Sequence, residues 1–133
     1  MTLRALDGDA LRIRPDHSEL RIALPWIRSM PLACIHDLVV EIDGTAADVA
    51  VLLGERRLSP NELIAEDAWW YLQDRLVLEL PVLASGSHDV AVAFDLEVPY
   101  LAIGPAPLRL PIRDSRELTD GPVVSRPARQ DVA

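Results

Sequence analysis

The residues of this chain best suited to chemistry are three histidines and a single cysteine, Cys34. A metal site needs two or more ligands at fixed spacing on one element, whereas His17, His36 and His88 stand in separate turn or strand-entry positions. Two of the histidines are followed by Asp, but adjacent strand residues point to opposite faces, so these pairs do not cooperate. We therefore expect no metal ligands in this chain, and we expect histidines that cap or solvate turns.

Other catalytic patterns are missing from the sequence. Cys34 lies between Ala33 and Ile35, which predicts a buried and inert thiol. We find no G-x-S-x-G nucleophile turn, no phosphate-binding glycine loop and no paired-carboxylate motif. The sequence thus predicts no catalytic residue and no cofactor-binding residue in this chain.

The aromatic residues are few and more informative. Trp69, Trp70 and Tyr71 are contiguous. Consecutive residues of an extended segment cannot all enter one core, so we expect at least one of these rings to face outward, toward a partner, a ligand or a covering loop.

A second aromatic segment, LPWIRSMPL at residues 24–32, contains Trp26, Arg28 and Met30. Trp, Arg and Met are enriched at buried protein interfaces, which favours a docking segment. In the alternative interpretation Trp26 plugs one end of the fold. Tyr100 follows Pro99 and allows the same two interpretations. The predicted subunit interface, which the sequence also allows at an active-site rim, comprises Trp26, Arg28, Met30, Trp69, Trp70 and Tyr100.

The elements that would position these residues are mostly strands. Large apolar residues recur at every second position within 11–14, 20–24, 38–43, 49–53, 76–80 and 89–98, mostly with polar residues or alanine between them. Asp43-Gly44 is a turn dipeptide, and Ser59-Pro60-Asn61-Glu62 predicts the start of a short helix of about two turns. Half-solvated alternation is typical of antiparallel sheets. The pattern predicts an all-β fold, an antiparallel, jelly-roll-like β-sandwich with one short helix.

Length and composition predict one domain, because 133 residues with 50% hydrophobic content suffice for a single core. We expect a β-sandwich over residues 1–112, with the prolines at 99, 105, 107 and 111 on edge strands or extended segments. Residues 113–133 are polar and aperiodic, which predicts an extended or partly disordered C-terminal tail.

The net charge and the hydropathy of the chain argue against some classes of partner. Thirteen basic residues, all Arg, face 21 acidic residues for a net charge of −8, which disfavours nucleic acid. No apolar run reaches membrane-spanning length, and charges interrupt the first residues where a signal peptide would be apolar. With a single cysteine and no sign of an oxidising compartment, we expect a cytoplasmic protein without membrane contact.

In order, the segments LPWIRSMPLACIHDLVVEIDG, SPNEL, DAWWYLQDRLVLELP and SGSHDVAVAFDLEVPY resemble the small β subunit of the bacterial C-glycoside deglycosidases. The resemblance covers about Leu20 to Tyr100, and the order and spacing of these segments carry it. The residues before Leu20 and those after Arg113 contain no motif that contributes to this resemblance.

The resemblance implies a two-subunit lyase that cleaves a carbon–carbon bond. A larger α subunit, an α/β barrel, would carry a divalent metal of the Mn or Mg type and the catalytic histidine, and the β subunit, inactive alone, would pack against it in a hetero-oligomer. The substrate would be a C-glycoside, such as a flavonoid C-glycoside, already oxidised at C3. The C3 ketone acidifies the C2 proton, and its removal leads to elimination of the aglycone. No catalytic role is carried over onto this chain.

Two other classes of function remain open from the residues. Exposed tryptophans that stack on sugar faces would suit a free-standing carbohydrate-binding module without catalytic activity. A structural β domain with all its tryptophans in the core would be a monomer without a partner.

Overall fold

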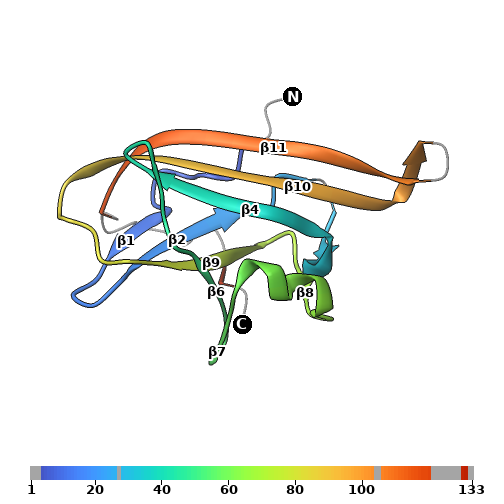
Figure 1. The fold of residues 1–133 in the computed structure, drawn as a ribbon, viewed down its shortest axis with the longest axis horizontal. Helices are drawn as coiled ribbons and strands as arrows, with labels where there is room; N and C mark the ends of the chain where they lie inside the picture. The colour runs from blue at the N-terminus through green and yellow to red at the C-terminus, as the bar shows by residue number, and fades with distance from the viewer. Residues whose placement is uncertain (1–3, 27, 104–105, 121–129, 132–133) are drawn as a thin grey trace.

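The computed structural model describes residues 4–26, 28–103, 106–120 and 130–131. Two antiparallel sheets pack face to face, which confirms the predicted all-β sandwich (Figure 1). The elements are β1 (Leu11–Ile13), β2 (Ser18–Ala23), β3 (Met30–Pro31), η1 (Leu32–Cys34), β4 (Ile35–Ile42), β5 (Thr45–Ala46), β6 (Ala50–Leu53), β7 (Arg56–Leu58), η2 (Pro60–Ala65), β8 (Trp69–Trp70), β9 (Asp74–Leu80), β10 (Ser87–Ile103), β11 (Ala106–Thr119) and β12 (Gln130–Asp131).

The first sheet has the strand order β1-β2-β9-β6-β7, and β12 pairs with β9 in parallel. The alternation at 11–14 and 20–24 predicts a hairpin, and β1 and β2 form it, with Leu11 opposite Leu20 and Ile13 opposite Ser18. Side chains alternate along these strands, so leucines and isoleucines enter the core while the arginines stand on the outer face.

The second sheet has the order β11-β10-β4-β5. The turn predicted at Asp43-Gly44 is confirmed: both residues have positive φ, 52° and 82°, and Ile42 pairs with Thr45 across it. This two-residue hairpin matches the geometry that Asp-Gly favours.

The core lies between the two sheets. Inward residues of β2 and β9 face inward residues of β4 and β10, and the alternation predicted for residues 89–98 places five apolar side chains in the core. The five are Val90, Val92, Phe94, Leu96 and Val98, each at most 1% exposed. Sheet-on-sheet packing of this kind buries one face of each strand and leaves the other polar.

The predicted short helix is η2, a 3₁₀ helix that begins after Ser59. Pro60 opens it, and the Ser59 backbone N–H donates to Glu62 Oε1 at 2.9 Å, as the start signal predicts. A shorter 3₁₀ turn, η1, follows β3. Within the described ranges no helix is long and apolar enough to cross a membrane.

Strand β11 continues through residues 113–119, where the sequence predicts a tail. Thr119 still pairs with Ser87, so the boundary expected after residue 112 falls inside a strand. Pro107 and Pro111 lie on this edge strand, as the sequence predicts, and Pro99 lies on β10 beyond Leu96, where pairing with β4 ends. Residues 121–129 and 132–133 of the predicted tail lie outside the described residues, as does Pro105.

Candidate functional site

A two-stranded sheet joins the two aromatic segments that the sequence singles out. In it, β3 pairs with β8, with Met30 opposite Trp70 and Pro31 opposite Trp69. The Leu72 backbone N–H donates to Ser29 Oγ at 2.7 Å, which ties the loop before β3 to the loop after β8. Segments about forty residues apart are therefore held together at one end of the sandwich (Figure 1).

Trp70 fixes the orientation of its neighbours. Its ring is fully buried, with its centroid 6.2 Å from that of Phe94, and its Nε1 donates to the main-chain oxygen of Asp74 at 3.0 Å. Because side chains alternate along a strand, an inward Trp70 turns Trp69 and Tyr71 outward. They are 46% and 51% exposed, which confirms the prediction that at least one of the three rings faces out.

Four large apolar side chains are exposed within nine residues, and we call this set the apolar corner: Ile64, Trp69, Tyr71 and Leu72. Among the described residues, only Val39 and Val82 are comparable exposed hydrophobics, and both lie elsewhere in the chain. Ile64 and Leu72 were not among the residues selected from the sequence. Ile64 follows Leu63 in the predicted short helix, and two adjacent residues of a short helix do not both face the core. Leu63 is buried and Ile64 is exposed.

The other residues of the predicted interface have different surroundings. Met30 is 1% exposed and Trp70 is 0% exposed, so both support the apolar corner from within the core and neither side chain reaches the surface. Trp26 is half-buried and packs against the core, which agrees with its interpretation as an end plug. Arg28 is exposed. Tyr100 belongs to β10, and its side chain lies outside the described residues.

Charges near the apolar corner are mainly acidic. Glu62 and Asp67 are exposed, and Glu66 pairs with Arg56 at 2.9 Å. The hydrogen bond from Arg56 lowers the pKa of Glu66, and the backbone N–H of Ser59 lowers the pKa of Glu62. Both carboxylates are therefore ionised at neutral pH. Arg56 balances the charge of Glu66, so Glu62 and Asp67 supply the negative charge in this part of the chain.

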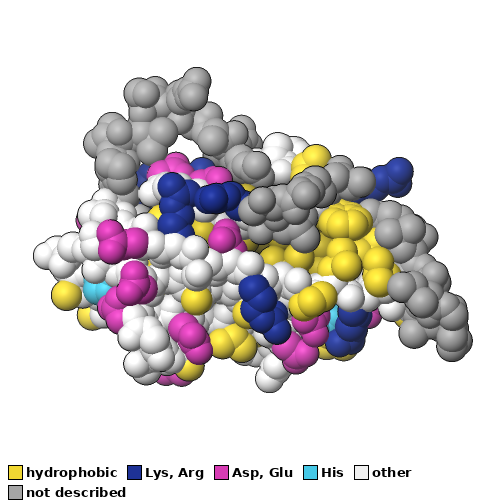
Figure 2. Space-filling view, turned by 90° about the horizontal axis from the view of Figure 1, so that it is seen from above, with side chains coloured by type: hydrophobic (Ala, Val, Ile, Leu, Met, Phe, Trp, Pro, Cys, Tyr) yellow, Lys and Arg dark blue, Asp and Glu magenta, His cyan; other side chains and the backbone are white. Residues whose placement is uncertain are grey.

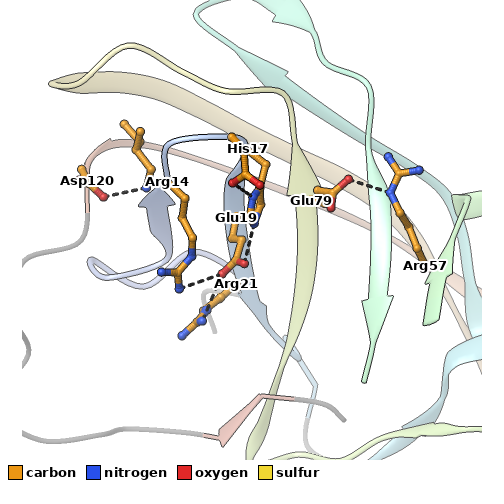
Figure 3. A network of polar contacts seen from close by, with 9 residues as sticks. Arg14, His17, Glu19, Arg21, Arg57, Glu79 and Asp120 are labelled. Carbon is orange, nitrogen blue, oxygen red and sulfur yellow. Dashed lines mark hydrogen bonds and ion pairs between the residues drawn. The ribbon is translucent and has the colours of Figure 1, made fainter. Parts of the chain in front are cut away.

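Each of the three histidines contacts a carboxylate, and His88 also contacts a main-chain oxygen. His17 lies between Asp16 (2.7 Å) and Glu19 (2.9 Å), and Glu19 also contacts Arg14 and Arg21 (Figure 3). The hydrogen bond to Glu19, followed by that to Asp16, raises the pKa of His17. With both ring nitrogens occupied by neighbours, His17 serves the β1–β2 hairpin as a structural link.

His88 and His36 each contact a carboxylate that is distant in sequence, Asp43 and Glu97 respectively. His88 Nδ1 contacts Asp43 at 2.7 Å and Nε2 contacts the Ala84 main-chain oxygen at 2.7 Å, and these bonds, that to Ala84 first, raise the pKa of His88. His36 Nε2 contacts Glu97 at 3.2 Å. The prediction that these histidines do not act with the Asp that follows each of them agrees with these contacts.

Neither a reactive thiol nor a metal cluster emerges from the residues that the structure describes. Burial, and then the charge of Glu97, raises the pKa of the Cys34 thiol, which keeps it protonated as predicted. Among these residues no group of three or more His, Cys, Asp or Glu side chains could hold a metal ion. The apolar corner carries exposed aromatic and aliphatic side chains, and this composition suits protein contact.

The comparisons with known proteins identify the family. No protein-family model matches this chain. The 3'-dehydrocarminate deglycosidase beta subunit of Microbacterium sp is 36% identical over 122 residues, which covers 86% of this chain and 92% of the relative. The C-glycoside deglycosidase beta subunit of Microbacterium trichothecenolyticum is 31% identical over 106 residues, or 75% of this chain and 81% of the relative. The chain belongs to the C-glycoside deglycosidase beta subunit family.

A further beta subunit of this family, from Arthrobacter globiformis, is 29% identical over 122 residues, covering 86% of this chain and 93% of the relative. The resemblance noted from the sequence is thereby confirmed. The name "beta subunit" implies a partner subunit in a hetero-oligomer.

Proposed function

We propose that this chain is the non-catalytic small subunit of a lyase that acts on 3-oxo-C-glycosides, and that it stabilises a larger catalytic subunit by docking through the apolar corner. The observation that carries the docking role is the outward pair Trp69 and Tyr71, held in place by the buried Trp70 between them. Rigid aromatic side chains that project from a short strand are typical anchors of protein interfaces.

The proposed reaction needs a base, a proton donor and exclusion of water. Removal of the C2 proton gives the enolate of the C3 ketone. The enolate electrons then form a C1=C2 double bond as the C3 carbonyl is restored, the bond between C1 and the aglycone breaks with its electron pair on the aglycone carbon, and that carbon takes up a proton. A divalent metal of the Mn or Mg type in the larger α/β-barrel subunit would stabilise the negative charge. The small subunit would contribute positioning and exclusion of water.

The acidic side chains near the apolar corner predict basic side chains on the partner surface. The apolar corner would meet an apolar patch on the larger subunit, and Lys or Arg side chains around that patch would face Glu62 and Asp67. Arg28, exposed in the adjoining loop, would meet a carboxylate or carbonyl group of the partner.

The test is co-expression of this chain with its candidate large subunit, followed by size-exclusion chromatography with light scattering and an assay of aglycone release from a 3-oxo-C-glycoside. We expect a stable mixed complex that is active, with neither chain active alone. The double variant Trp69→Ala/Tyr71→Ala should lose the complex. Val82→Ala serves as the matched control, because Val82 is a 56% exposed hydrophobic residue outside the apolar corner.

A carbohydrate-binding module is the second candidate, and the same exposed aromatic pair favours it, since such rings stack on sugars. The two functions differ in a direct measurement. A chain that ignores the large subunit, stays monomeric and binds glycans through Trp69 and Tyr71 would replace the subunit proposal with the module. A mixed complex without glycan binding by the free chain would exclude the module.

A further inference from the structure

The outer face of the second sheet has a trough along β10. A hollow of about 550 Å³ is lined by outward side chains of three strands: Val39, Glu41, Ala91, Ala93, Arg113 and Ser115. A second hollow of about 400 Å³ shares Glu41, Ala91 and Ser115 with the first, so the two are continuous. The floor is low because the outward residues at the middle of β10 are alanines.

The register defines the width of this trough. Ala93 pairs with Val39 on β4 and with Arg113 on β11, while Ala91 pairs with Glu41 and Ser115. The walls are thus two strand spacings apart, roughly 10 Å. An α-helix with its side chains is about 10–12 Å across. Val39, on one wall of the trough, is 46% exposed, so its apolar side chain is accessible for contact with such a helix.

The charged side chains around the trough are mainly acidic, which favours a basic binding partner. Asp89 and Asp95 lie on the outward face of β10 at either end of the two alanines, and Glu41 and Glu117 stand on the neighbouring strands. Within the described residues these four carboxylates form no ion pair, and the Arg113 guanidinium donates to the main-chain oxygen of Ile112 at 3.1 Å. An occupant with Lys or Arg on its flanks would match this charge.

A second copy of this chain does not match it. If two of these sheets packed face to face around a two-fold axis, β10 would lie over β10, and Asp89 or Asp95 would meet the same kind of carboxylate. Like charges in direct opposition are destabilising, and the chain as a whole carries a net charge of −8. Arg113, which lines the trough in each copy, does not balance four carboxylates, so a different protein with several basic residues matches the trough better than a second copy does.

Resting on the proposed function, we infer that this trough is a second docking site, which receives a basic amphipathic helix of the large subunit. Small or apolar residues of that helix contact Val39, Ala91 and Ala93, and its basic flanks lie beside Glu41 and Asp95. The trough is separate from the apolar corner, since it lies on the outer face of β4, β10 and β11. Figure 2 views the molecule from the side on which β11 lies in Figure 1; Arg and acidic side chains stand on this face, and hydrophobic side chains gather in the right half of the view.

Thiol labelling tests occupation of the trough directly. Ala93→Cys places a thiol on its floor, and Glu55→Cys places one on the exposed turn between β6 and β7 as a control. Wild-type chain gives the background from the buried Cys34. In the free chain both new thiols should react with a maleimide. In the complex we expect Ala93→Cys to react at least about ten times more slowly and Glu55→Cys to be unchanged. Equal rates for Ala93→Cys in the free chain and in the complex overturn the proposal.

Affinity gives the second measurement. Ala93→Trp fills the trough and Asp95→Lys reverses its charge, and each should weaken binding of the large subunit about tenfold or more, with Glu55→Lys as the matched charge control. A circular dichroism melt establishes that each variant is folded. If these variants bind like wild type while Trp69→Ala/Tyr71→Ala does not, the trough proposal fails and the proposed function stands. If wild-type chain does not bind the large subunit, the proposed function fails and the trough proposal falls with it.

Discussion

The ring of Trp70 lies against the ring of Phe94, with centroids 6.2 Å apart and planes inclined by 45°. Trp70 belongs to the small sheet beneath the apolar corner and Phe94 to the middle of β10. This contact anchors the exposed aromatic surface to the core of the sandwich, so the orientation of Trp69 and Tyr71 depends on the packing of the residue between them.

Adjacent tryptophans should therefore respond differently to truncation. Trp70→Ala removes a fully buried ring and should lower the free energy of unfolding by about 3–5 kcal/mol. Trp69→Ala, at a residue that is 46% exposed, should change it by less than about 1 kcal/mol. Urea denaturation followed by far-ultraviolet circular dichroism measures both. Equal losses would contradict the division into a core ring and a surface ring.

Arg28 should contribute to assembly more than to stability. Its side chain is exposed beside the loop that Ser29 links to Leu72. If Arg28 is an interface anchor, Arg28→Ala should weaken affinity for the large subunit by about 2 kcal/mol or more, measured by calorimetry on the purified chains. Arg28→Lys, which keeps the charge but loses the planar fork, should recover part of the affinity. Unchanged affinity in Arg28→Ala would remove Arg28 from the docking surface.

His88 should make stability depend on pH. Its bonds to the Ala84 oxygen and to Asp43 raise its pKa above the ordinary 6.5, so its contribution is fully present below 6.5 and is lost as pH rises through the raised pKa. The difference in unfolding free energy between wild type and His88→Gln should therefore shrink as pH increases above 6.5. Urea titrations at a series of pH values measure this difference. A constant difference, or one that grows with pH, would contradict the assignment.

Replacing Gly44 by a residue with a side chain should lower stability, because the backbone there has a positive φ. Its φ is +82°, and a Cβ built there meets no heavy atom within 4 Å, so space is not the limit. Gly44→Ala should cost about 1 kcal/mol because L-residues disfavour this conformation. Gly44→Asn should cost less, since Asn tolerates left-handed backbone. Thermal unfolding of the two variants gives the order, and an unaffected Gly44→Ala would refute the explanation.

Asp114 should hold the N-terminal segment onto the sheet. Its Oδ2 accepts hydrogen bonds from the backbone N–H groups of Ala5 and Leu6, both at 2.9 Å, and these two residues are fully buried. Asp114→Ala leaves both donors unsatisfied and should cost about 1–3 kcal/mol. Hydrogen exchange should show faster exchange at these two amides while the amides of β9 keep their protection. Slow exchange at Ala5 and Leu6 in this variant would show that other contacts hold the segment.

Much of the fold could be read from local patterns. Alternation gave β1, β2, β6, β9 and the first part of β10, and a turn dipeptide and a helix-start signal gave the β4–β5 hairpin and η2. Strands without alternation were not predicted. Residues 113–119 contain polar side chains on both faces, because Asp114 and Arg116, on the same face as the buried Leu118, bind the N-terminal segment. A polar inner face of this kind hides a strand from any rule based on hydrophobic alternation.

The candidate site divides in the same way. The sequence by itself determined that three consecutive aromatic residues could not all be buried, because an extended chain turns neighbours to opposite sides. It also determined the acidic charge and the separation of the histidines. Only the tertiary structure decided which ring is buried, since that choice depends on Phe94 and on the pairing of Trp70 with Met30. The trough likewise depends on which residues of β4 and β11 stand beside Ala91 and Ala93, and that register joins positions up to about seventy residues apart.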